Sequence, residues 1–233
     1  MFSYYGSKSK IVDLYPPPKF DKIIEPFAGS ARYSLKYWQK DVLLIDKYEI
    51  IVKVWQWLQK CSPNDILSLP NMEAGQNTDD FNFDCIEAKW LIGFCINGGS
   101  ASPKKTVKDF NTWNEAKKVI AKNTKKIKHW TIQLGTYDEI PNFPNVTWFI
   151  DPPYQFGGEY YRFSNKDIDF NHLANWCRNR TGQVIVCENT KADWMDFKPM
   201  KGMQGSLYKT VEAIWSNHKT NYDNVQVSLF EGM

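Results

Sequence analysis

Several features that would place this 233-residue chain in a specialised class are missing from its sequence. No apolar run approaches the roughly 18 residues of a membrane-spanning helix, and we expect no signal peptide. The five cysteines are an odd number and form no C-x-x-C pair, which argues against a zinc site or a disulfide framework. The sequence therefore predicts a cytoplasmic protein with reduced thiols, no metal and no membrane contact.

Two further patterns are absent. No segment repeats at a fixed period, which argues against repeat architectures. The fingerprint G-x-G-x-x-G is missing as well, which argues against a nicotinamide cofactor. Hydrophobic residues make up 42% of the chain and aromatic residues 15%, enough for a substantial core. This length and composition predict one domain, or one domain with a modest insertion.

Apolar strands and helices alternate in the first and last parts of the chain. Such alternation predicts an α/β fold whose mostly parallel sheet is covered on both faces. The tail adds two further strands that are predicted to form a closing antiparallel hairpin. The predicted strands are 22–27, 42–45, 146–151, 183–190, 209–217 and 224–230. Three helices are predicted with them: one directly after the turn at 28–31, one that begins near 49, and one at 169–180.

The segment 61–137 does not continue this alternation, and we predict that it is a mainly helical insertion between 1–60 and 138–233. It contains a helix at 83–96 and a basic helix at 112–128. The stretch 104–128 contains nine lysines and only two acids, although the whole chain carries a net charge of only +3. The apolar residues Trp113, Ala116, Ile120 and Ile127 fall on one face of the basic helix, and Lys118, Lys122 and Lys125 on another.

Small and acidic residues follow the first two predicted strands. In open α/β sheets, ligands bind beyond the carboxyl ends of the strands. Gly29 allows a backbone to approach a ligand closely. Asp46 comes 17 residues later, near the spacing at which dinucleotide-type folds place an acid on ribose hydroxyls. This pair alone is also compatible with ordinary turn geometry.

A sharper signal ends the predicted strand 146–151, where the chain reads Asp151-Pro152-Pro153-Tyr154. Asp151 and the carbonyl of Pro152 can accept the two hydrogens of an exocyclic amine, and the proline rings aim that carbonyl in advance. Tyr154 offers a flat face for an unstacked base. Two acceptors on one amine favour a pyramidal nitrogen, whose lone pair can attack an electrophilic methyl group.

These motifs resemble those of the Dam-like (alpha group) N6-adenine-specific DNA methyltransferases. "DPPY" is similar to their motif IV, "EPFAGSARYSL" to motif I, "LLIDKY" to motif II, and "YYGSKSK" to the motif that precedes them. The resemblance implies a class I fold that binds S-adenosylmethionine (SAM), and a product of N6-methyladenine in double-stranded DNA. The chain departs from the commonest motif I pattern at Ala31, where glycine is frequent.

The resemblance also implies roles for individual residues. Tyr4 and Lys8 would hold the methionine end of SAM, Phe27 and Gly29 would line the cofactor, and Asp46 would take the ribose hydroxyls. The catalytic group would be Asp151, Pro152, Pro153 and Tyr154, with Asp151 also close to the transferred methyl group. Aspartate at position 151 favours adenine over cytosine N4 as the target.

The insertion occupies the place of the family's target-recognition region, so its basic face is expected to contact DNA phosphates. The residues expected to bind DNA are Asn97, Lys104, Lys105, Lys118, Lys122 and Lys125. The resemblance further implies a monomer or weak dimer in the cytoplasm of a bacterial or virus-infected cell.

Two alternatives stay open at the sequence level. The chain could methylate another amino group, such as cytosine N4, an adenine in RNA or a protein side-chain amide. It could instead be a catalytically silent relative that only binds nucleic acid. The sequence does not distinguish restriction protection, repair marking and viral DNA modification as biological roles.

Overall fold

A seven-stranded sheet forms the centre of the computed structural model, which describes residues 1–109, 111–200 and 211–222. Its strand order is β3-β2-β1-β4-β5-β7-β6. This is the doubly wound order 3-2-1-4-5-6 with β7 added between β5 and β6. The fold is therefore α/β and compatible with a Rossmann-like architecture. The strands are β1 (Lys22–Glu25), β2 (Asp41–Asp46), β3 (Thr131–Leu134), β4 (Val146–Ile150), β5 (Gln183–Asn189), β6 (Lys198–Pro199) and β7 (Glu212–Ser216).

The predicted mostly parallel sheet is confirmed, because every pairing from β3 through β5 is parallel. β7 falls within the first predicted tail strand and pairs antiparallel with both β5 and β6. The second predicted tail strand, 224–230, lies outside the described residues. The strand β1 ends at Glu25, earlier than predicted, because Pro26 has no N–H to continue a ladder.

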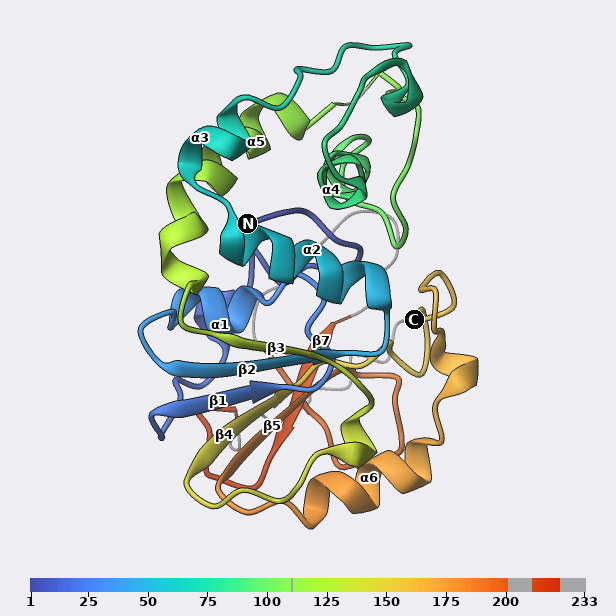
Figure 1. Ribbon diagram of the computed structural model, residues 1–233. Helices are drawn as coiled ribbons and strands as arrows, with labels where there is room; N and C mark the ends of the chain where they lie inside the picture. The colour runs from blue at the N-terminus through green and yellow to red at the C-terminus, as the bar shows by residue number, and fades with distance from the viewer. Residues whose placement is uncertain (110, 201–210, 223–233) are drawn as a thin grey trace, which may run out of the picture.

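Helices cover both faces of this sheet, as predicted (Figure 1). The helices α1 and α2 lie on one face and α6 on the other, and all five residues of β4 between them are buried. The α-helices are α1 (Arg32–Lys36), α2 (Glu49–Lys60), α3 (Pro63–Leu67), α4 (Ile86–Cys95), α5 (Trp113–Asn123) and α6 (Phe170–Arg178). The short 3₁₀ helices are η1 (Val12–Leu14), η2 (Thr78–Asp80), η3 (Thr124–Ile127), η4 (Tyr137–Glu139) and η5 (Asn165–Asp167).

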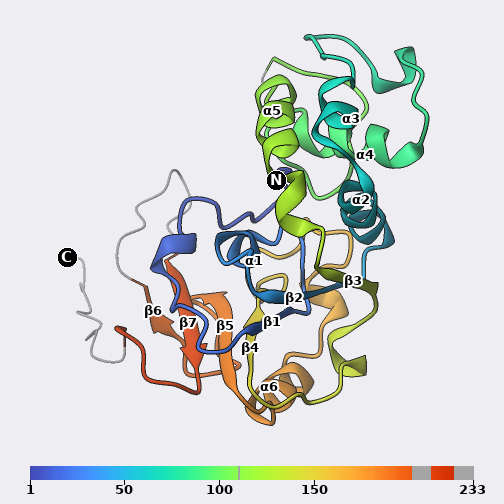
Figure 2. The ribbon, with the colours of Figure 1, turned by 60° about the vertical axis from the view of Figure 1, so that its left-hand side comes forward.

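The predicted insertion includes one strand of the sheet. β3 pairs in parallel with β2, from Leu43 opposite Thr131 to Asp46 opposite Leu134. The helical part that leaves the sheet therefore ends before Thr131, and the predicted boundary at 137 is too late. Only Ile132 of β3 is buried, so this edge strand lacks the apolar pattern that marks the central strands. The helices α3, α4 and α5 lie together on the α2 side (Figures 1 and 2).

The predicted basic helix corresponds to α5 followed by η3. Trp113, Ile120 and Ile127 are fully buried, as the periodicity predicts. The helix tightens at Thr124, whose hydroxyl donates a hydrogen bond to the carbonyl of Ala121 at 3.0 Å. The apolar face of this segment therefore packs inward, and its polar face remains at the surface.

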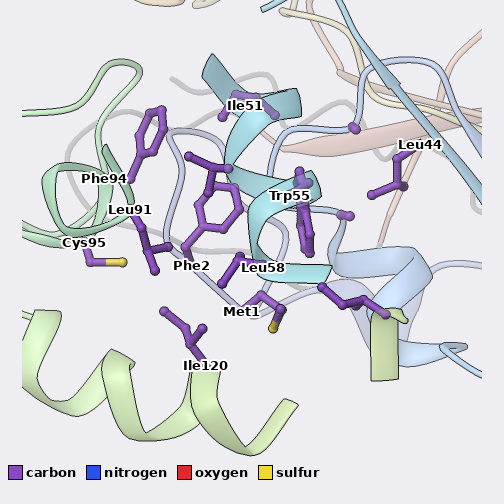
Figure 3. Close-up of a cluster of buried hydrophobic side chains, with 14 of the residues drawn as sticks. Met1, Phe2, Leu44, Ile51, Trp55, Leu58, Leu91, Phe94, Cys95 and Ile120 are labelled. Carbon is purple, nitrogen blue, oxygen red and sulfur yellow. The ribbon is translucent and has the colours of Figure 1, made fainter. Parts of the chain in front are cut away.

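The N-terminal residues join the insertion to the sheet. Phe2 is fully buried, and its ring centroid lies 5.1 Å from that of Trp55 in α2 and 5.7 Å from that of Phe94 in α4. Figure 3 shows apolar side chains of α2, α4 and α5 around Phe2. One apolar cluster includes the first residues of the chain together with residues of these helices. This packing holds the start of the N-terminal segment in place.

Candidate functional site

A cavity of about 320 Å³ lies at the carboxyl ends of the parallel strands. Three carboxylates that line it come from three strand ends: Glu25 ends β1, Asp46 ends β2, and Asp151 follows β4. The cavity thus lies at the point where the chain order of the sheet reverses, between β1 and β4, which is where open α/β sheets bind ligands. Its volume is within the range of small-molecule sites.

Asp46 fixes the glycine turn that follows β1. Its carboxylate oxygens accept hydrogen bonds from the backbone N–H of Gly29 at 2.9 Å and of Tyr48 at 2.8 Å. The carbonyl of Gly29 accepts a further bond from the indole N–H of Trp55 at 2.9 Å. Burial raises the pKa of Asp46 to about 6, against the effect of the two backbone bonds. The predicted pair of Gly29 and Asp46 is therefore brought together at the cavity wall.

Gly29 is required at this turn for two reasons. Its φ of 44° lies in the left-handed region, and a Cβ there would lie 3.1 Å from Cδ1 of Tyr4. Tyr4, Phe27 and Gly29, which the resemblance assigns to the cofactor, all line the cavity. The ring of Phe27 stacks with that of Tyr137, with centroids 5.6 Å apart and planes at 27°.

Lys8 and Asp151 form a close ion pair inside the site. The Nζ atom of Lys8 lies 2.8 Å from Oδ1 of Asp151, and the two side chains are 9% and 21% exposed. Burial raises the pKa of Asp151 to about 6, because the ammonium of Lys8 only partly opposes desolvation and Glu212 adds a second negative charge. Burial alone would lower the pKa of Lys8, but Asp151 and Glu212 together raise it above its ordinary value.

The four residues of the Asp-Pro-Pro-Tyr motif divide into two groups. Asp151 and Pro153 line the cavity, whereas Pro152 and Tyr154 are not part of its lining. The hydroxyl of Tyr154 donates a hydrogen bond to Glu212 at 2.5 Å, and the ammonium of Lys8 lies 4.5 Å from the centre of the Tyr154 ring. The tyrosine is thus held by Lys8, which the sequence indicated, and by Glu212, which it did not.

The loop after the motif folds back onto the N-terminal segment. Tyr161 donates a hydrogen bond to the carbonyl of Tyr5 at 3.3 Å, and its ring centroid lies 5.9 Å from that of Tyr4. The backbone N–H of Tyr5 in turn donates a hydrogen bond at 3.4 Å to the carbonyl of Ser100. Ser100 belongs to the insertion, where it ends the glycine-containing stretch 97–100. This segment therefore connects the insertion, the cavity and the loop after Tyr154.

Some cavity residues were not predicted because the strand before them was missed. β3 delivers a run of four residues from Gly135 to Asp138 to the cavity. Recognising 131–134 as a strand would have placed this run at the ligand-binding edge. Tyr161 and Phe163 also line the cavity, and they carry no pattern that separates them from ordinary loop aromatics.

The residues predicted to bind DNA lie on the insertion, away from the cavity lining. The five lysines Lys104, Lys105, Lys118, Lys122 and Lys125 are exposed. Lys105 pairs with Asp79 at 3.0 Å, and Lys118 with Glu115 at 2.9 Å. These pairs are open to solvent and bind weakly, so both ammonium groups remain accessible to a polyanion.

Hydrogen bonds within the protein hold the side chain of Asn97 and those of two lysines in the basic stretch 104–128, Lys117 and Lys128. The side chain of Asn97 donates to the carbonyl of Thr106 at 2.9 Å and accepts from the N–H of Lys108 at 2.7 Å. Lys117 is buried and donates to the carbonyl of Leu69 at 2.8 Å. Lys128 donates to the carbonyl of Cys61 at 2.7 Å. The surface available to a polyanion is therefore smaller than the count of lysines indicates.

Within the described residues, no group of three or more His, Cys, Asp or Glu side chains is placed to hold a metal ion. The five cysteines are free thiols. In the same part of the chain, no helix is long and apolar enough to cross a bilayer.

No protein-family model and no curated protein sequence matches this chain. The function must therefore be inferred from the fold, the cavity and the side chains that face it.

Proposed function

We propose that this chain is a SAM-dependent methyltransferase that modifies N6 of an adenine flipped out of double-stranded DNA. The observation that carries the proposal is Asp151, which leaves the central strand β4 at the switch point of the sheet and faces the cavity. Its carboxylate is partly buried and paired with Lys8. An acid held in this way can accept a hydrogen bond from an amine that enters the cavity.

The cavity residues fit SAM in three respects. The turn at Gly29 lets the backbone approach a ligand, and Asp46 lies beside it to accept hydrogen bonds from ribose hydroxyls. The stacked rings of Phe27 and Tyr137 offer an aromatic wall for a purine. Lys8 is a cationic partner for a carboxylate. When bound, SAM supplies an electrophilic methyl group on a positively charged sulfur.

The protein's own residues would prepare the amine for attack. The carboxylate of Asp151 would accept one amine hydrogen, and the carbonyl of Pro152 the other, which favours a pyramidal nitrogen with an available lone pair. With a pKa of about 6, Asp151 is mainly ionised at neutral pH and can serve as an acceptor. Tyr154 would support the plane of the base from the position that its hydroxyl bond fixes.

The basic face of α5 and η3 supports DNA as the larger substrate. Lys122 and Lys125 are exposed, and within the described residues neither side chain forms a hydrogen bond or an ion pair. A surface of this kind neutralises phosphates without reading sequence.

The direct test is methyl transfer from labelled SAM to adenine-containing DNA. We expect the parent protein to label DNA, and Asp151→Asn to reduce the rate at least about a thousandfold, because the amide cannot replace the charged acceptor. Asp196→Asn is the matched control, since Asp196 is exposed and lies outside the cavity lining. Nucleoside mass spectrometry of the product separates adenine N6 from cytosine N4.

Two results would contradict the proposal. An Asp151→Asn protein that methylates as fast as the parent would exclude the proposed role of the carboxylate. A parent protein whose melting temperature does not change at saturating SAM would exclude SAM as a ligand, because any ligand specific for the folded state raises that temperature.

A further inference from the structure

Glu212 lies at the same edge of the sheet as the cavity, although it belongs to the antiparallel strand. It is the first residue of β7 and pairs with Asn189, the last residue of β5. Because β7 runs opposite to β5, its beginning lies where the parallel strands end. The sequence did not indicate this residue, because an acid at the start of a strand carries no signal of its own.

One carboxylate oxygen of Glu212 accepts two tyrosine hydroxyls. Oε1 lies 2.5 Å from the hydroxyl oxygen of Tyr15 and 2.5 Å from that of Tyr154. The ammonium of Lys8 lies 4.0 Å from the same oxygen, and the Glu212 side chain is only 13% exposed. Both hydroxyls can donate, so the carboxylate is their common acceptor.

These contacts connect Glu212 to the Asp-Pro-Pro-Tyr motif without placing it in the cavity. Glu212 is not part of the cavity lining, so it can act there only through its partners. One of those partners is Tyr154, whose ring is proposed to support the target base. A hydrogen bond on a tyrosine hydroxyl fixes the position of its oxygen and so restricts rotation about the Cα–Cβ bond. Because the O–H prefers to lie in the plane of the ring, a charged acceptor in a fixed direction also favours one ring plane.

We propose that Glu212 is a positioning residue for methyl transfer, which holds the Tyr154 ring in the plane that the target base requires. This inference depends on the proposed function, because it assigns Glu212 a part in that same reaction. The hydroxyl of Tyr15 occupies the same oxygen and keeps the carboxylate from turning away from Tyr154. Glu212 makes no contact with the reacting atoms.

The test is a double-mutant cycle on kcat between Glu212 and Tyr154. Tyr154→Phe keeps the ring but removes its hydroxyl bond. We expect Glu212→Ala and Tyr154→Phe each to lower kcat about tenfold, and the double variant to lose little more than either one, because both remove the same bond. Glu212→Gln keeps an acceptor oxygen and should recover most of the rate lost in Glu212→Ala.

Gln183→Ala is the matched control for lost stability. Gln183 is a buried polar residue at the opposite end of the sheet, where it accepts bonds from Lys19 at 2.8 Å and Thr147 at 2.9 Å. Its substitution should lower the free energy of unfolding and leave kcat of the folded protein within about twofold of the parent.

The outcomes separate this inference from the proposed function. An active parent in which the losses of Glu212→Ala and Tyr154→Phe multiply in the double variant overturns the positioning role alone. An active parent in which Glu212→Gln is as slow as Glu212→Ala also overturns it. A parent that transfers no methyl group to any nucleic acid overturns both proposals.

Discussion

Gly6 and Gly75 have similar backbone conformations but very different surroundings. Their φ angles are +72° and +86°, in the region that side-chain-bearing residues rarely adopt. A Cβ on Gly6 would lie 1.9 Å from the hydroxyl oxygen of Tyr161, whereas a Cβ on Gly75 would have no neighbour within 4 Å. The two positions therefore separate backbone strain from the close approach of Tyr161 to the N-terminal segment.

Gly6→Ala should reduce the free energy of unfolding by about 1–2 kcal/mol more than Gly75→Ala. Both substitutions cause similar backbone strain, because both glycines have a positive φ. Only Gly6→Ala also displaces Tyr161 from the cavity wall. Chemical denaturation measures both losses. Adding Tyr161→Phe to Gly6→Ala should recover most of the excess, because the nearest remaining ring atom would be 3.2 Å away. Equal losses at both glycines would show that the contact is unimportant.

At the scale of elements, the central strands were predictable and the edge strand was not. β4 is apolar except for Thr147 and is followed by Asp151, so both its burial and its place at the ligand edge follow from the sequence. β3 is only four residues long and three of these are exposed, so its pairing with β2 is decided by tertiary structure. The residues that β3 brings to the cavity were missed for the same reason.

The candidate site was predictable where a residue follows a recognisable strand or lies in a motif that resembles the family. Strand ends indicated Gly29, Asp46 and Asp151, the motifs added Tyr4, Lys8 and Phe27, and the structure brings all six to one cavity. Glu212 and Tyr161 reach the site through an antiparallel strand and a long loop. Glu212 and Tyr161 are separated from their contact partners by 58 and 156 residues, and no sequence pattern indicates contacts over such separations. These contacts can be seen only in the folded structure.

The polar face of α5 and η3 gives a prediction about DNA binding. Replacing Lys122 and Lys125 with glutamine should weaken DNA binding and reduce the slope of log Kobs against log salt by up to about 2, because each phosphate contact contributes about 0.9. The binding of SAM should not change. Fluorescence anisotropy over a range of salt concentrations measures the slope.

A matched pair of lysines lies at the amino ends of the parallel strands. Lys19 precedes β1 and Lys219 follows the antiparallel strand β7, and both lysines are exposed. Replacing both with glutamine should leave the salt slope unchanged. If this pair reduces the slope as much as Lys122 and Lys125 do, the insertion has no special part in binding a polyanion.

For the whole molecule, buried carboxylates at one sheet edge make stability depend on pH. Burial raises the pKa of Glu25 to about 8, although its carboxylate accepts a hydrogen bond from the N–H of Ser34 at 2.7 Å. Between its unfolded pKa of 4.5 and its folded pKa, the folded protein keeps a proton that the unfolded chain releases. Stability from this group is therefore lost as pH rises through that window.

Glu25→Gln should remove this dependence while keeping an acceptor for Ser34. We expect the free energy of unfolding of the parent, relative to the variant, to fall on the order of 3 kcal/mol between pH 5 and pH 8. Urea denaturation at several pH values measures the difference, and comparison of the two proteins cancels the contributions of Asp46 and Asp151. A difference that does not vary with pH would exclude the buried proton.

The cavity and the insertion divide the charge of the molecule between them. Six acids and three basic residues line the cavity, whereas the exposed face of α5 and η3 carries lysines. Inhibitors of opposite charge should therefore bind to different surfaces. A compound built on a sulfonium or quaternary ammonium centre would enter the cavity, and a polyanion such as heparin would occupy the lysine face. Because the two surfaces are distinct, inhibitors of these two kinds are expected to bind at the same time.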